Sequence, residues 1–137
     1  MACAKVCACA AYHAGVSSVL EQTVAGMNRG LRPDELVEQV ALPSELADNP
    51  YLKEFYGTIA WSVRAIYTFH LGWFDGNATS LDPLSDRDRA ARILRMSGGE
   101  ASVLESARDA LTSGDFQWAA ELADYVLVGN DSHAQAR

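Results

Sequence analysis

The segment Gly72–Asn77 combines residue types that could bind a ligand. Two large aromatic residues, Trp73 and Phe74, stand directly before an acid and close to an amide, Asp75 and Asn77. Loops normally lie on the surface, so this density of large aromatic residues between two glycines is unusual. This loop is therefore the least ordinary segment of the chain, and its four side chains are candidate binding residues. The structural alternative is that the aromatic pair fills the core beneath a turn while the acid and the amide form local Asx-type hydrogen bonds.

Arg64 is the fifth candidate for substrate binding. It is the only full charge in the apolar segment Ile59–Leu71. A guanidinium group can donate two parallel hydrogen bonds to an oxyanion. A lone arginine on an apolar helix also commonly pairs with a neighbouring acid, and both interpretations stay open at this stage.

The three cysteines fall within the first nine residues. Cys3, Cys7, Cys9 and His13 have a spacing from which a soft-metal site can be drawn. Structural zinc sites usually take ligands from two separated segments, whereas these four lie on one terminal segment. We therefore interpret residues 1–14 as an alanine- and cysteine-rich leader before a domain at 15–137. We predict no metal-binding residue and no cofactor in this chain.

Composition and charge exclude several kinds of partner. Eighteen acids against eleven bases give a net charge of −7, which argues against nucleic acid because affinity for phosphates comes from Lys and Arg. The uncharged stretches are shorter than the roughly 20 apolar residues of a membrane span. The apolar run near the N-terminus is too short for a signal peptide, so a cytoplasmic location is the default expectation.

Helical periodicity between Gly and Pro residues predicts an all-α fold, with no period-2 strand. The expected helices cover residues 10–29, a short segment from Pro33, 59–71, 86–97, 100–113 and 116–128. Thr58 and Ser85 are the expected N-caps of the third and fourth of these. His70 is expected in the core, and the Leu104, Ala107 and Leu111 face should pack against Ala119, Leu122, Ala123 and Leu127.

The last two expected helices are similar to a single tetratricopeptide-like helix pair turning at Gly114. At least three such repeats are needed for an independent solenoid. We therefore expect a helical bundle that ends in one such pair and not a peptide-binding solenoid.

Residues 59–71 are apolar on nearly every side, as expected for a helix that is buried all round. Such a helix lies either at the centre of a bundle or in a subunit interface. Few other helices exist to cover it. We therefore predict a homodimer whose interface includes part of the region Tyr51–Phe74.

Several motifs resemble the dimerisation domain of bacterial alkylsulfatases, which are metallo-β-lactamase-type sulfate-ester hydrolases. The most specific are YGTIAWSVRAIY at 56–67, LGWFDGN at 71–77 and the LDPL sequence at 81–84. EQTVAGMNRG at 21–30, PDE at 33–35 and MSGG at 96–99 extend the match. The resemblance covers about Gly15 to Arg137.

The resemblance implies a middle domain between a zinc hydrolase domain and a sterol-carrier-like domain. The zinc ligands of such hydrolases lie in an HxHxDH motif, which this chain lacks. The chain alone is therefore expected to contain no catalytic residue and to be inactive, with a metallo-β-lactamase-type hydrolase domain as a partner. Trp61 stands where several alkylsulfatases carry a histidine, and an indole cannot act as an acid or a base.

The resemblance also implies that the Gly72–Asn77 loop lies near the mouth of the hydrolase domain, where Trp73 and Phe74 would contact an alkyl chain. Two other functions stay open. One is a freestanding helical interaction module that binds a partner through the C-terminal helix pair. The other is an accessory chain that supplies this loop to the active site of another chain.

Overall fold

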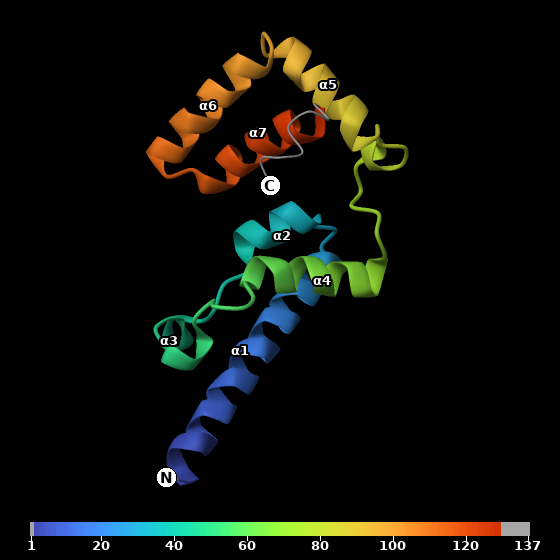
Figure 1. Ribbon diagram of the computed structural model, residues 1–137. Helices are drawn as coiled ribbons and strands as arrows, with labels where there is room; N and C mark the ends of the chain where they lie inside the picture. Colours follow the sequence, from blue (N-terminus) through green and yellow to red (C-terminus); the bar gives the residue numbers. More distant parts are fainter. Residues whose placement is uncertain (1, 130–137) are drawn as a thin grey trace. The chain divides into compact units, whose positions relative to one another are not determined.

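The computed structural model describes residues 2–129, with side chains from residue 8 onward, and this part is helical without a strand (Figure 1). The predicted all-α fold is confirmed. The elements are α1 (Ala2–Asn28), α2 (Pro33–Gln39), α3 (Ser44–Ala47), the 3₁₀ turn η1 (Pro50–Leu52), α4 (Ile59–Leu71), the 3₁₀ turn η2 (Ala78–Ser80), α5 (Asp86–Met96), α6 (Glu100–Ser113) and α7 (Phe116–Gly129). The chain forms two compact units, unit 1 (Met1–Leu81) and unit 2 (Asp82–Arg137).

In unit 1, α1 begins at Ala2, eight residues before the expected start at position 10. The early segment is rich in alanine, the best helix former, so it continues the helix. Whether a domain boundary follows residue 14 stays a prediction. The helix ends where Gly30 takes a positive φ of 83° and its N–H donates to the Met27 carbonyl, a conformation that glycine adopts without strain.

The core of unit 1 forms where α4 lies across the C-terminal half of α1 and beside α2 (Figure 1). Its five buried residues come from these three helices and from the position directly after α2: Val19, Leu36, Val40, Val63 and Tyr67. Gly26 permits the close approach of α1 and α2, because a Cβ atom at this position would collide with the side chain of Leu36.

α4 has the predicted bounds and the predicted N-cap. The Thr58 Oγ accepts a hydrogen bond of 3.0 Å from the Trp61 N–H. Of the two positions expected for α4, the centre of a bundle is wrong within unit 1. α1 and α2 pack against one side only, so Val63 and Tyr67 are buried while Phe69 is 84% exposed. His70, predicted in the core, is exposed for the same reason.

In unit 2, α7 packs against both α5 and α6 (Figure 1). Ser85 caps α5 as predicted, and Gly114, in the left-handed conformation, ends α6 before α7 begins two residues later. The core contains Leu122, with Leu104 and Ala107 packed against it, as expected, but its other buried residues are Val103 and Val126. Leu111 is 58% exposed. Each step of one residue turns the side-chain direction by about 100° around the helix axis, so a small error in the expected face moves a leucine from the core to the surface.

The helix pair around Gly114 is present, while its likeness to a tetratricopeptide repeat stays a prediction. Within residues 2–129, no helix is both long enough and apolar enough to cross a bilayer.

Candidate functional site

Four of the five candidate residues line one polar hollow on unit 1, with a volume of about 490 Å³. Arg64 comes from α4, and Trp73, Asp75 and Asn77 come from the loop after it. The opposite wall is formed by the start of α2, from Arg32 to Glu35. Phe74 does not line this hollow. The structure therefore brings together residues that the sequence could place only on neighbouring segments.

Asp75 and Asn77 form the local hydrogen bonds that the structural alternative predicted. The Asn77 N–H donates to Asp75 Oδ1 at 2.8 Å, and the Ser80 hydroxyl donates to Asp75 Oδ2 at 2.9 Å. The Thr79 N–H donates in turn to Asn77 Oδ1 at 3.1 Å. The backbone N–H of Asn77, then the Ser80 hydroxyl, lower the pKa of Asp75, and the charge of Arg32 acts in the same direction. Asp75 is therefore a charged residue that shapes the turn.

The aromatic pair does not fill the core, contrary to the other half of that alternative. Trp73 is 69% exposed, and Phe74 is exposed to a smaller extent. The two rings meet edge to face, with centroids 5.8 Å apart, an arrangement that aromatic rings favour. Both rings are thus available for contact with another molecule or domain.

Arg64 pairs with a neighbouring acid. Its guanidinium donates a hydrogen bond of 2.9 Å to Asp34 Oδ1 on α2, in a solvent-exposed ion pair. The hollow also contains Arg32, Glu35 and Asp75. Three acids against two arginines leave a small negative excess, so an anion entering this hollow has to compete with carboxylates already present.

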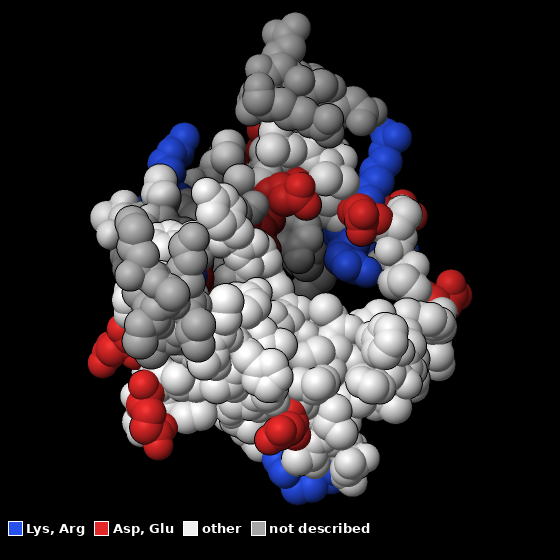
Figure 2. Space-filling model, turned by 90° about the horizontal axis from the view of Figure 1, so that it is seen from below, with Lys and Arg blue, Asp and Glu red and all other residues white. Residues whose placement is uncertain are grey.

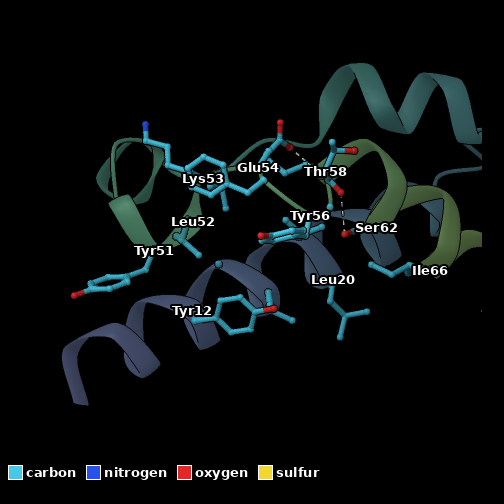
Figure 3. A pocket seen from close by; sticks show the side chains of 17 residues that line it. Tyr12, Leu20, Tyr51, Leu52, Lys53, Glu54, Tyr56, Thr58, Ser62 and Ile66 are labelled. Carbon is cyan, nitrogen blue, oxygen red and sulfur yellow. Dashed lines mark hydrogen bonds between the residues drawn. The ribbon is translucent and has the colours of Figure 1, made fainter. Parts of the chain in front are cut away.

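The second feature is an apolar groove on unit 1, which the sequence interpretation did not identify. Its volume is about 730 Å³, and it lies between α1, η1, the connection after η1, and α4. Figure 3 shows Tyr12 and Leu20 of α1 on one side of this groove, with Leu52, Tyr56 and Ile66 on the other. A signal was present in the sequence, because Tyr12, Val16 and Leu20 recur at intervals of four residues, one face of a helix.

Aromatic residues in this chain lie mainly on the surface. The chain has three tryptophans, five tyrosines and four phenylalanines, and only Tyr67 among these twelve is buried. Seen from the side on which α1 begins, the molecule shows a broad area without Lys, Arg, Asp or Glu (Figure 2). Large exposed apolar areas mark sites of association in soluble proteins.

In the part of the chain with described side chains, no three His, Cys, Asp or Glu residues lie close enough to hold a metal ion. Cys9 is an exposed free thiol. Cys3 and Cys7, the other thiols of the hypothetical N-terminal site, lie outside the residues whose side chains are described.

Comparison with known proteins identifies the family. Residues 32–137 match the alkyl sulfatase dimerisation family, and the chain belongs to this family. A linear primary-alkylsulfatase from a Pseudomonas strain is 50% identical over 113 residues, and an (R)-specific secondary-alkylsulfatase from Pseudomonas is 35% identical over 112 residues. The solved structure of a stereoselective inverting sec-alkylsulfatase from Pseudomonas matches with a TM-score of 0.78 at 32% identity. The family resemblance found in the sequence is confirmed.

The chain spans about a fifth of the length of these relatives. The comparisons cover 82%, 81% and 86% of this chain, but 21%, 17% and 19% of the respective relatives. What the relatives catalyse as whole proteins is therefore a property of much longer chains.

Proposed function

We propose that this chain forms a homodimer and thereby joins two copies of an alkylsulfatase-type protein. The observation that carries this proposal is the exposed apolar side of α4, where the described residues of unit 1 leave Trp61, Phe69 and Leu71 more than half exposed. The family to which the chain belongs takes its description from dimerisation.

The energetics favour a second copy over exposure to water. Burying one large apolar side chain contributes roughly 1.5–3 kcal/mol, and several such side chains lie on the same unit. Association also has costs in lost translational and rotational freedom. An interface that covers a group of these residues together can offset those costs, and a two-fold interface covers the same patch on both copies.

Sedimentation velocity over a wide concentration range tests this proposal. We expect a species with twice the mass of one chain at micromolar concentration, and a dissociation that appears only on dilution. A species that keeps the mass of one chain at tens of micromolar would contradict the proposed function.

We propose that sulfate-ester hydrolysis belongs to a separate metallo-β-lactamase-type domain that binds zinc. Zinc would supply a bound water with a pKa near neutrality in that domain. Among the described residues of this chain we assign no zinc ligand, and Trp61 cannot transfer a proton. The test is sulfate release from dodecyl sulfate, with the chain alone and with an added hydrolase domain. We expect release only in the second case, and steady release by the repurified chain alone would contradict this proposal.

A second candidate function is a contribution to substrate binding, favoured by the shared hollow of Arg64, Trp73, Asp75 and Asn77. The exposed rings of Trp73 and Phe74 would contact the alkyl part of a sulfate ester. In an assembly with an active hydrolase domain, Trp73→Ala should raise KM for long alkyl chains more than for short ones. A Leu81→Ala variant, also exposed on unit 1, is the control. Equal effects of Trp73→Ala on both chain lengths would remove this candidate.

A further inference from the structure

The apolar groove is built from exposed faces of elements far apart in the sequence. Tyr12, Val16 and Leu20 form its α1 wall, and all three side chains are exposed in the single chain. Gly15 forms part of the floor, where a Cβ atom would lie 3.1 Å from the side chain of Leu52. Gly15 is buried, and its lack of a side chain lets Leu52 pack directly against the backbone of α1 at the bottom of the groove.

Two aromatic residues at the edge of this groove are the most exposed of the large apolar residues in its lining. Phe55 is 79% exposed and Tyr56 is 100% exposed. Two local hydrogen bonds nevertheless shape the connection that contains them. The Glu54 carboxylate accepts a hydrogen bond of 2.6 Å from the Ile59 N–H, and the Phe55 N–H donates to the Lys53 carbonyl at 3.0 Å. A connection fixed in this way loses little conformational entropy when it contacts a partner.

The charge of the chain restricts where two copies can meet. Each copy has a net charge of −7, so most orientations bring like charges together. The 17 residues that line the groove include one base and one acid, Lys53 and Glu54, and their charges cancel. This face therefore adds no like-charge repulsion of its own to the association of two identical chains.

The exposed area at the groove is close to what a stable dimer needs. Each large aromatic side chain has an area of about 200 Å². Multiplied by their exposed fractions, four such side chains at the groove together expose about 600 Å²: Tyr12, Tyr51, Phe55 and Tyr56. Val16 and Leu20 add to this area. Each partner in an interface of standard size buries about 800 Å².

We propose that the apolar groove is the seat of a second copy of this chain, with Phe55 and Tyr56 as the anchor residues of a two-fold interface. This inference rests on the proposed dimer and assigns its centre to a particular face. In a two-fold contact the same patch meets itself, so each copy offers both a groove and an aromatic edge. Buried aromatic residues at the centre of an interface commonly dominate its binding energy.

The test compares the dimer dissociation constants of three variants by sedimentation equilibrium. Val16→Glu places a charge in the groove, and Tyr56→Ala removes a side chain that makes no contribution to the monomer core. We expect each to weaken the dimer by about tenfold or more. Phe116→Glu, at an exposed position of unit 2, is the matched control and should leave the dissociation constant unchanged. Circular dichroism checks that all three keep the helical content of the parent chain.

The outcomes separate this inference from the proposed function. A parent chain that dimerises while both groove variants dimerise equally well would overturn the inference and leave the dimer intact. A monomeric parent chain would overturn both. If an alkyl glycoside detergent changed the fluorescence of that monomer, and Val16→Glu abolished the change, the groove would be assigned to an alkyl ligand instead.

Discussion

Unit 1 and unit 2 differ in how far each covers its own apolar residues. Unit 2 consists of three consecutive helices joined by short turns, and Leu94, Leu104 and Ala107 pack against its core of Val103, Leu122 and Val126. Unit 1 joins α1 to α2 by a short turn but α2 to α4 by a long segment, and it closes its core on one side of α4 only. Of the ten exposed aromatic residues, eight belong to unit 1.

This difference assigns different tasks to the two units. Helices that follow one another directly can bury their apolar faces against each other at a low cost in loop entropy. Unit 2 is organised in this way, and among its described residues it exposes two aromatic side chains, Phe116 and Trp118. Unit 1 retains an exposed α4 face and an apolar groove, so it is the unit whose stability we expect to depend on a partner.

The largest effect should come from removing a core side chain from each unit. Leu36 is fully buried, and Leu36→Ala should lower the free energy of unfolding by about 2–5 kcal/mol. Leu122→Ala is the matched change in unit 2. Urea unfolding can follow the units separately by fluorescence in variants that keep only Trp61 as a reporter of unit 1 or only Trp118 as a reporter of unit 2. Leu36→Ala should also weaken the dimer. If Leu122→Ala weakened it equally, the proposed division of tasks would be wrong.

A smaller loss of stability is expected from a change where α1 and α2 approach each other most closely. Gly26→Ala forces the buried Leu36 side chain to move, and such overpacking typically costs about 1–3 kcal/mol. Gly57→Ala is the control, because no atom lies within 4 Å of the added Cβ. Thermal unfolding measures both variants. Equal melting temperatures for the two variants would show that α1 and α2 can move apart without a loss of stability.

The N-caps of α4 and α5 allow a comparison of two equivalent local contacts. Thr58→Ala and Ser85→Ala each remove a side-chain acceptor from a helix N-terminus and should cost about 1 kcal/mol. Only Thr58→Ala should also weaken the dimer, because Thr58 follows the Phe55–Tyr56 connection. Thr58→Ser keeps the acceptor and should restore both properties. Chemical unfolding and sedimentation provide the two measurements.

The smallest effect concerns Asp75. Its pKa is lowered in the folded state, chiefly by the Asn77 N–H and then by the Ser80 hydroxyl. The charged Asp75 therefore stabilises the fold at pH values above the ordinary pKa of an aspartate. This stabilisation is lost as the pH falls through the lowered pKa of the folded state. NMR titration of the carboxyl carbon should show a higher pKa in Ser80→Ala. Thr79→Ala, whose hydroxyl bonds to Asn77 and not to Asp75, should leave that pKa unchanged.

Local signals in the sequence predicted most of the helices, because the signals act between neighbouring residues. Thr58 and Ser85 cap their helices as expected, and α4 and α6 have the predicted bounds. The start of α1 was placed too late, since the alanine-rich segment was interpreted as a leader when its composition also favours a helix. The family was recognisable because its motifs are continuous segments of the chain.

The sequence by itself determined the all-α class, the caps and the family, all of which depend on residue type at short spacing. The tertiary structure decided that Arg64 meets Asp34, that His70 is exposed, and that α1 and α4 leave an apolar groove between them. Each of these depends on which side of a helix faces another helix. That choice is made by the packing of segments tens of residues apart, and periodicity along one segment cannot express it.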